Sequence, residues 1–227
     1  FYEMFDEDAR TVHDALGLTL TQRTEGIPMA GVPFHAVDGY LRRMLDQGFR
    51  VAVCDQVQDT SEAKGVVERA VTRVLTPGTL VDEGLLDDAS NLTVFVLLDE
   101  SADQAAIACA ELSTGRFSVQ SADLERVVDV VARLGPAELL VPDTDLDHER
   151  IADIARACAC PVTPRPAWTL AAETASRLLC EHWSVHSTAG WGLPNGDPRI
   201  AVAGALLQCL LALSLIHISA PPRPGLI

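Results

Sequence analysis

The sequence of 227 residues is long enough for one large domain or two of ordinary size. Its 48% hydrophobic and 22% charged residues are typical of a globular chain and exclude an intrinsically disordered one. The formal net charge is −15, and residues 1–90 alone hold 16 Asp and Glu against 8 Lys and Arg. No segment carries a basic excess that would hold a phosphate backbone by itself, which argues against autonomous binding of nucleic acid.

Cysteine spacing and hydropathy exclude two further classes. The six cysteines form no C-x-x-C pair, and Cys158 and Cys160 have no histidine at zinc-finger spacing, so we predict reduced thiols, no metal site and a cytoplasmic protein. We find no signal peptide. Residues 200–216 are apolar but interrupted by glycine, glutamine and serine, which favours a packed helix over a membrane span.

The first part of the chain alternates short strand and helix patterns. We predict a strand at 1–5, a helix at 6–16, a strand at 18–21, a loop at 22–33, a helix at 35–47, a strand at 49–56, a polar turn at 59–65 and a strand at 70–76. This order predicts a small α/β domain over residues 1–85, followed by an acidic linker at 86–91. Within the predicted loop, residues 28–35 are too apolar for ordinary exposure, so they either pack under the first strand or form a contact surface.

A second pattern begins after the linker and fills residues 92–212. Three strands at 92–98, 104–112 and 116–120, separated by short turns, predict an antiparallel meander. They are followed by a helix at 122–134, a strand at 138–141, a helix at 147–157, a strand at 161–163, a helix at 169–182, a loop at 183–198 and a helix at 199–212. The whole chain is thus predicted to be mixed α/β, and this second domain has the element order of ribonuclease-H-like folds.

Both ends of the sequence carry unusual features. The chain does not begin with Met and opens inside a predicted strand, so we expect it to be an N-terminally truncated fragment. Residues 213–227 break the last helix without completing another element. They look like a translated sequencing-adapter tail, and the alternative is a Pro-rich disordered end.

The first strand carries a pattern with two interpretations. Side chains alternate along a strand, so Phe1, Glu3 and Phe5 share one face. One interpretation buries Phe1 in the core with Glu3 at its rim, because Phe is commonly buried. The other has an aromatic ring and a carboxylate reaching toward the same ligand. Phe5 is predicted to lie in the core, on the same face of the strand.

Eight ordered segments together resemble one family, the MutS DNA mismatch-repair proteins. They are FYEMF at 1–5, LTLT at 18–21, PMAGVPFHAV at 28–37, VAVCDQ at 51–56, KGVVER at 64–69, TPGT at 76–79, STGRF at 113–117 and PAELL at 136–140. A lone Phe-x-Glu is not specific, but the ordered set is, and it spans residues 1–212. The resemblance implies a mismatch-recognition domain over 1–85 and a connector domain over 92–212.

The resemblance also implies roles for individual residues. Phe1 is expected to wedge against a mispaired base from the minor groove, and Glu3 to hydrogen-bond that base. Candidates for backbone or minor-groove contacts are Arg23, Arg69, the weaker Arg73, and Met29. Solvated charges are the alternative for the arginines, and core packing is the alternative for Met29.

For the complete protein, the family implies a DNA-dependent ATPase that uses ATP and Mg²⁺, forms a homodimer on mismatched duplex DNA, and engages a MutL-type partner. Its expected location is the bacterial cytoplasm, associated with the nucleoid. The sequence contains no G-x-x-x-x-G-K-[ST] phosphate loop. We therefore expect this chain by itself to have no catalytic residues and no cofactor, and not to bind DNA measurably at physiological salt.

Two other functions compete with mismatch recognition. A ribonuclease-H-like nuclease needs clustered carboxylates for metal ions, and Asp99 and Glu111, which end the first two strands of the second domain, are expected to lie near each other. However, residues 199–212 contain no Asp or Glu. A pure interaction module is the other alternative, with an acidic docking surface formed by Asp143, Asp145, Asp147 and Glu149.

Overall fold

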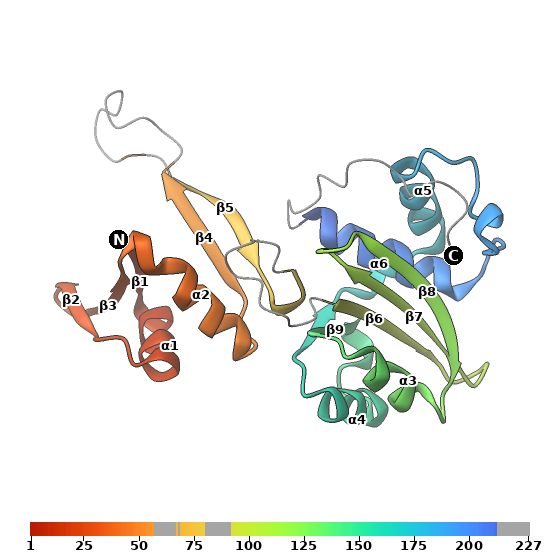
Figure 1. Ribbon diagram of the computed structural model, residues 1–227, viewed down its shortest axis with the longest axis horizontal. Coiled ribbons are helices and arrows are strands. Elements are labelled where there is room, and N and C mark those ends of the chain that lie inside the picture. The colour runs from red at the N-terminus through yellow and green to blue at the C-terminus, as the bar shows by residue number, and fades with distance from the viewer. Residues whose placement is uncertain (57–66, 68, 80–91, 213–227) are drawn as a thin grey trace. The chain divides into compact units, whose positions relative to one another are not determined.

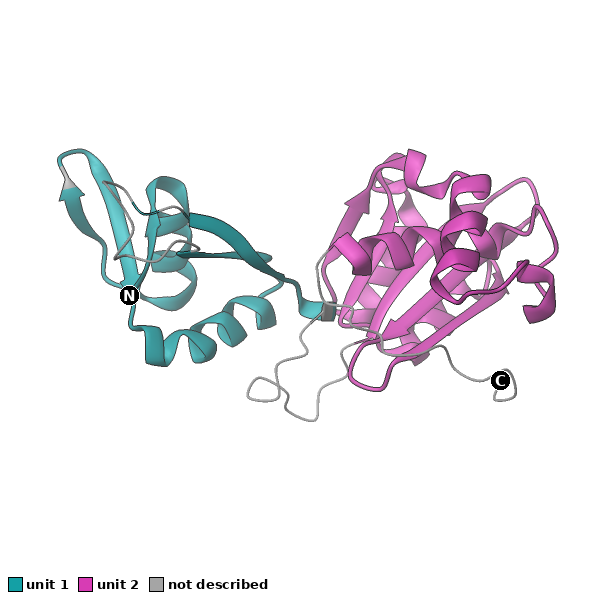
Figure 2. Ribbon diagram, turned by 90° about the horizontal axis from the view of Figure 1, so that it is seen from above, with its two compact units in different colours: residues 1–87 teal, residues 88–227 magenta. Residues whose placement is uncertain are grey.

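The computed structural model describes residues 1–56, 67, 69–79 and 92–212, and its backbone contacts divide the chain into two compact units (Figures 1 and 2). Unit 1 comprises Phe1–Asp87 and unit 2 comprises Asp88–Ile227. The predicted polar turn at 59–65, the linker at 86–91 and the tail at 213–227 lie outside the described residues.

A three-stranded antiparallel sheet forms the first part of unit 1. Its order is β1 (Tyr2–Phe5), β3 (Ile27–Val32), β2 (Thr21–Thr24). The predicted loop at 22–33 is therefore wrong, as is most of the predicted strand at 18–21, because this segment is a hairpin that turns at Gly26 (φ +84°). Pro28 misled the prediction, since proline is rare in a central strand, where it cannot donate to the ladder.

Two helices cover the inner face of this sheet. They are α1 (Asp6–Leu16) and α2 (Val37–Asp46), the latter preceded by the 3₁₀ turn η1 (Phe34–Ala36). The apolar stripe of α1 packs with Ala30 of β3 and Met44 of α2. Phe5, in contrast, is 42% exposed, so its predicted place in the core is wrong. It lies on the strand face opposite to the helices, because Tyr2 and Met4 take the inward positions.

A two-stranded antiparallel sheet completes the described part of unit 1. It pairs β4 (Val51–Gln56) with β5 (Arg69–Leu75), followed by the 3₁₀ turn η2 (Pro77–Thr79). Val53 and Leu75 are buried together with Val32 and Leu41. This shared core joins the hairpin to the first sheet and α2.

Unit 2 is built on a five-stranded mixed sheet. Its strands are β6 (Leu92–Asp99), β7 (Gln104–Glu111), β8 (Arg116–Asp123), β9 (Glu138–Pro142) and β10 (Val162–Arg165), in the spatial order β8-β7-β6-β9-β10. The first three are antiparallel neighbours, and β9 and β10 continue in parallel from β6. This is the predicted ribonuclease-H-like strand order, and the mixed α/β class is confirmed.

Helices cover both faces of this sheet (Figure 1). The helices α3 (Val127–Leu134) and α4 (Glu149–Cys158) pack on one face, while α5 (Ala172–His182) and α6 (Pro198–Ala212) lie on the other. Short 3₁₀ turns η3 (Asp143–Asp145), η4 (Ala167–Leu170) and η5 (Thr188–Trp191) connect them. The helix predicted from 122 begins at Val127, because β8 continues to Asp123.

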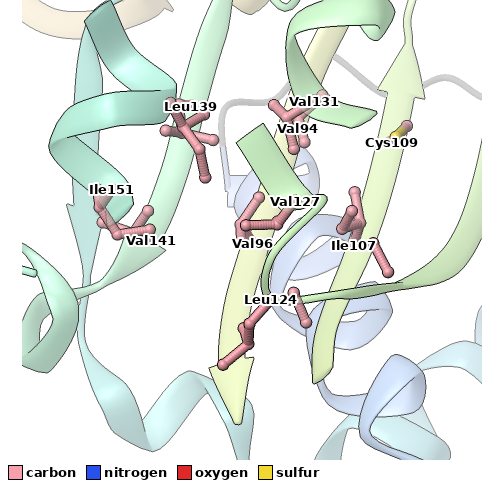
Figure 3. Close-up of a cluster of buried hydrophobic side chains, with 13 residues drawn as sticks. Val94, Val96, Ile107, Cys109, Leu124, Val127, Val131, Leu139, Val141 and Ile151 are labelled. Atoms are coloured by element: carbon pink, nitrogen blue, oxygen red, sulfur yellow. The ribbon is translucent and has the colours of Figure 1, made fainter. Parts of the chain in front are cut away.

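The central strands β6 and β7 are buried on both faces, which explains why helices cover both sides of the sheet. Val94 and Val96 of β6 point toward α3 and α4, in the cluster drawn in Figure 3, whereas Phe95 packs against α6. Ten of the fifteen residues of α6 are buried, as expected for a packed helix. Within the described residues, no helix is both long and apolar enough to cross a bilayer.

Candidate nucleic-acid interface

The face of the three-stranded sheet that the helices leave uncovered carries four of the predicted site residues. We call it the outer face and define it by Phe1, Glu3, Phe5, Arg23, Met29 and Gly31. Phe1 is 84% exposed, which is rare for phenylalanine and contradicts its burial in the core. The ring and the carboxylate two residues away stand on the same side of β1, as the strand period requires.

Gly31 forms the floor between these two side chains. It pairs with Glu3 in the β1–β3 ladder. A Cβ at this position would meet the Tyr2 carbonyl oxygen at 3.4 Å, Phe1 Cδ1 at 3.8 Å and Glu3 Cγ at 3.9 Å. Glycine therefore leaves the space between the aromatic ring and the carboxylate open.

An ion pair crosses the outer face. Arg23 Nη1 donates to Glu3 Oε2 at 3.0 Å and lies 3.4 Å from Glu3 Oε1. Arg23 is the extra residue of a bulge in β2, because Gln22 pairs with Pro28 while Thr24 pairs with Ile27. Bulges redirect side chains in this way. With the Arg23 side chain 70% exposed, we expect the pair to stabilise the fold by less than about 1 kcal/mol.

A second polar group lies behind the outer face. The Tyr2 hydroxyl donates to Asp55 Oδ1 of β4 at 2.6 Å, and Thr72 Oγ1 of β5 donates to Asp55 Oδ2. The hydrogen bond to Asp55 raises the pKa of Tyr2. The hydrogen bonds from Thr72 and Tyr2, and the nearby Arg73, lower the pKa of Asp55. The phenol is thus a donor and the carboxylate an anion at neutral pH.

The other two predicted arginines lie on the second sheet rather than on the outer face. Arg69 is exposed and pairs with Gln56 at one end of β5, whereas Arg73 is half-buried, pairs with Val53 and lies near Asp55. Met29 is half-buried and pairs with Phe5 and Thr21 on the outer face. The structure therefore brings Phe1, Glu3, Arg23 and Met29 together and leaves the two β5 arginines apart from them.

The carboxylates of the nuclease alternative are not adjacent. Asp99 ends β6 and Glu111 ends β7, but these strands are antiparallel, so the two residues lie at opposite ends of the ladder, separated by about 24 Å at 3.4 Å per residue. The expectation that they lie near each other is wrong. Asp99 accepts hydrogen bonds from Ser101 and Ala102, which lower its pKa, and Glu111 accepts one from Thr114.

The acidic residues of the interaction-module alternative surround η3 in unit 2. Asp143 accepts a hydrogen bond from the Ala167 backbone at 3.0 Å, which ties η3 to η4. Asp145 accepts one from Thr144, and Asp147 and Glu149 are exposed beside the start of α4. Across the parts of the chain that the structure describes, no group of three or more His, Cys, Asp or Glu residues could hold a metal ion.

Comparison with known families matches each unit separately. The family model described as MutS domain I matches residues 1–84, and the one described as MutS domain II matches residues 92–220. The DNA mismatch repair protein MutS of Chlorobium phaeovibrioides (strain DSM 265 / 1930) is 37% identical over 219 residues. This chain belongs to the MutS family. The alignment covers 92% of the chain and 25% of that relative, so the chain spans about a quarter of the relative's length.

Membership of the MutS family confirms the resemblance found in the sequence, and it assigns the outer face to MutS domain I. The match to MutS domain II runs to residue 220, so a non-native tail from residue 213 stays a prediction. Sequence reasoning missed Gly31 and the Tyr2–Asp55–Thr72 contacts. The signal for Gly31 was present in the apolar stretch 28–35, whereas contacts between residues 2 and 55 need the fold.

Proposed function

We propose that the outer face reads mispaired or unpaired bases in duplex DNA, as part of a MutS-type mismatch-repair protein. The observation that carries this proposal is the pairing of an exposed aromatic ring, Phe1, with a carboxylate, Glu3, on one strand face above a glycine floor. A side chain with this exposure contributes little to the core. It is available to contact a ligand.

The ring suits a base that has lost its partner. A mispair unstacks at low cost, and an aromatic ring placed beside it replaces the lost stacking at roughly 1–3 kcal/mol per base. Apolar wedges in the minor groove kink the duplex, and a defective step costs less to kink than an intact one. Phe1 would therefore select for deformability, which suits a protein that accepts many different mispairs.

The carboxylate suits selectivity rather than affinity. Glu3 accepts from the N–H of an extrahelical or displaced base, in a charge-assisted hydrogen bond of roughly 1.5–3 kcal/mol. Against a matched duplex it offers only repulsion from phosphates. In the free protein, the Glu3 carboxylate is paired with Arg23. This exposed pair opens at a cost below about 1 kcal/mol, so Arg23 is free to move to a phosphate as Glu3 takes its base.

The acidic composition of the chain limits what unit 1 does by itself. With 16 acidic against 8 basic residues in 1–90, the isolated chain is expected not to hold DNA at physiological salt. We propose that the remainder of a full-length, homodimeric protein in the bacterial cytoplasm, on the nucleoid, supplies the backbone contacts. It also supplies the ATP- and Mg²⁺-dependent ATPase, since the residues of this chain do not fit a phosphate-loop site.

We also propose that unit 2 transmits the state of the mismatch site and docks a MutL-type partner. The exposed acids around η3, together with Leu146 and Trp168, form the surface that supports this role. Loss of partner capture by the full-length protein after Asp143→Lys and Asp147→Lys is the expected result. Capture that survives this charge reversal would contradict it.

The experiment for the outer face replaces Glu3 in the full-length protein and compares a mismatched duplex with its matched counterpart by fluorescence anisotropy. Glu3→Ala is expected to lower the mismatched-to-matched affinity ratio, because the mismatched complex loses the hydrogen bond to the base and the matched complex loses the repulsion between the carboxylate and the phosphates. Glu7→Ala is the control, since Glu7 is an exposed carboxylate on α1 rather than on the outer face. Equal changes in both affinities would contradict a base-reading role for Glu3.

A further inference from the structure

The proposed wedge stands next to the first pair of the β1–β3 ladder. The ladder between β1 and β3 begins with Tyr2 opposite Val32, so Phe1 precedes the first paired residue. A ring that inserts between bases must hold its direction against the duplex. The residue next to the ring, Tyr2, is one place from which this direction can be fixed.

Tyr2, the next residue, is held from the other side of the strand by three contacts. Its hydroxyl donates to Asp55 at 2.6 Å in a half-buried position. Its ring stacks on that of Phe34, with centroids 5.9 Å apart and planes 20° from parallel. The ring also packs against the core that includes Val32, Leu41 and Val53. The residue beside the wedge is therefore fixed in both direction and depth.

The acceptor of this hydrogen bond is itself held by an irregularity in the second sheet. Val53 pairs with Arg73, but Cys54 pairs with Val71, so Thr72 is the extra residue of a bulge in β5. The bulge turns the Thr72 hydroxyl onto Asp55 Oδ2, while Oδ1 remains for Tyr2. Each carboxylate oxygen thus has its own hydroxyl donor, and the carboxylate bridges β5 to β1.

We propose that the Tyr2–Asp55–Thr72 chain of hydrogen bonds is a positioning device for the mismatch wedge, which makes these three residues determinants of mismatch selectivity. The inference rests on the proposed function of Phe1. None of the three needs to touch DNA, because the chain acts by fixing the backbone of Tyr2. It also links the DNA-reading strand to the β4–β5 hairpin, which is 53 residues away in sequence.

The hydrogen bond of Tyr2 can be removed without disturbing the packing of unit 1. Tyr2→Phe keeps the ring, its stacking and its packing, and removes only the hydroxyl. Asp55 keeps Thr72 and the neighbouring Arg73, so no carboxylate is left without partners. Tyr40→Phe is a matched control, because Tyr40 is the other tyrosine in the sequence and is also half-buried. Among the residues that the structure describes, no hydrogen bond from its hydroxyl is seen.

The test measures affinities for a mismatched and a matched duplex in the full-length protein, with Tyr2→Phe, Tyr40→Phe and Phe1→Ala, and with Tyr2→Phe in the Phe1→Ala background. Tyr2→Phe is expected to lower the mismatched-to-matched ratio about three- to tenfold, the effect of one hydrogen bond, and Tyr40→Phe to leave it unchanged. In the Phe1→Ala background, Tyr2→Phe should have no further effect, because the residue it positions is gone. Thr72→Val should reproduce part of the loss.

The outcomes separate the positioning role from the proposed function. An unchanged ratio for Tyr2→Phe, in a protein where Phe1→Ala abolishes preference, overturns the positioning role and leaves the wedge intact. An equal fall in the affinity for the mismatched duplex on Tyr2→Phe, with and without the Phe1 ring, also overturns it, since a general effect on unit 1 would act in both backgrounds. If Phe1→Ala itself leaves the preference unchanged, the proposed function fails first.

Discussion

The contact between α5 and α6 gives a sharp test of the packing of unit 2. A Cβ added at Gly204 would lie 2.3 Å from Ala175 Cβ and 2.5 Å from Ala175 Cα. Ala175 is a buried alanine with no side chain that can rotate away, so relief requires the two helices to separate. Gly204→Ala should therefore destabilise unit 2, although alanine is the better helix former by about 1 kcal/mol.

The size of the effect follows from these opposing contributions. Overpacking that moves backbone costs typically about 1–3 kcal/mol, and sometimes more. The added Cβ would lie less than 3.0 Å from both Ala175 Cβ and Ala175 Cα, and neither atom can rotate away. We therefore expect the overpacking cost of Gly204→Ala to lie at or above the upper end of that range. After the helix-propensity gain is subtracted, we expect a net loss of about 2 kcal/mol. For a unit the length of residues 92–212, this lowers the Tm by roughly 8 °C.

A matched control substitutes the same residue in a helix with free space. Gly39 lies in α2 of unit 1, and a Cβ there has no neighbour within 4 Å. Gly39→Ala should gain about 0.5–1 kcal/mol and raise the Tm of unit 1 by about 3–6 °C. A lower Tm of unit 2 on Gly204→Ala and a higher Tm of unit 1 on Gly39→Ala would show that the close approach of α5 and α6, rather than the loss of a glycine, decides the result.

The two units can be followed separately in one sample. All three tryptophans belong to unit 2 and both tyrosines to unit 1, so Trp fluorescence during heating reports unit 2 alone. Calorimetry on the same chain adds the transition of unit 1. A Trp-detected Tm that rises on Gly204→Ala, as the transition of unit 1 does on Gly39→Ala, would refute the proposed packing of α5 against α6.

Three further predictions follow from local geometry. Asp197 accepts from the backbone N–H of Arg199, the second residue of α6, so Asp197→Ala should cost about 1 kcal/mol at pH 7 in chemical denaturation. The hydrogen bond from the Arg199 side chain lowers the pKa of Asp197, so this deficit is full above about pH 4 and shrinks as the pH falls further. Burial raises the pKa of Cys109 to about 11 and that of the half-buried Cys160 to about 12, so at pH 8 iodoacetamide should modify exposed Cys54 first. Mass spectrometry follows the order of modification, and early modification of Cys109 or Cys160 would contradict this. Gly31→Val should change the free energy of unfolding by no more than about 1 kcal/mol, since Val suits a strand. It should nevertheless reduce mismatch preference, because it fills the space between the Phe1 ring and the Glu3 carboxylate, and an unchanged preference would contradict the glycine floor.

The segments that sequence alone placed correctly are those with a strong period. The apolar stripe of α1 has helical spacing, and β6 and β7 are continuous apolar runs bounded by short polar turns, from which the meander of unit 2 followed. The hairpin of β2 and β3 was missed because Pro28 and Gly31 look like loop residues. In the fold, glycine at position 31 leaves the space between the Phe1 and Glu3 side chains open, and that requirement opposes the usual strand preference.

Pairing between distant residues marked the limit of sequence reasoning at the candidate site. Strand period placed Phe1 and Glu3 on one face, but it also placed Phe5 in the core, because period alone does not say which face is buried. Asp99 and Glu111 were judged close from their positions at strand ends, and only the antiparallel register separates them. The Tyr2–Asp55 contact depends on how two sheets pack, which no local pattern encodes.

The most direct test of the central claim is the ratio of affinities for a mismatched and a matched duplex, measured at one fixed salt concentration in the full-length protein with Phe1→Ala. Removing one base–aromatic contact of roughly 1–3 kcal/mol should lower mismatched affinity by roughly 5- to 150-fold and bring the ratio close to one. Matched-duplex affinity should remain nearly unchanged, because the wedge has no base to support there. A ratio that survives the substitution would show that Phe1 is not the wedge.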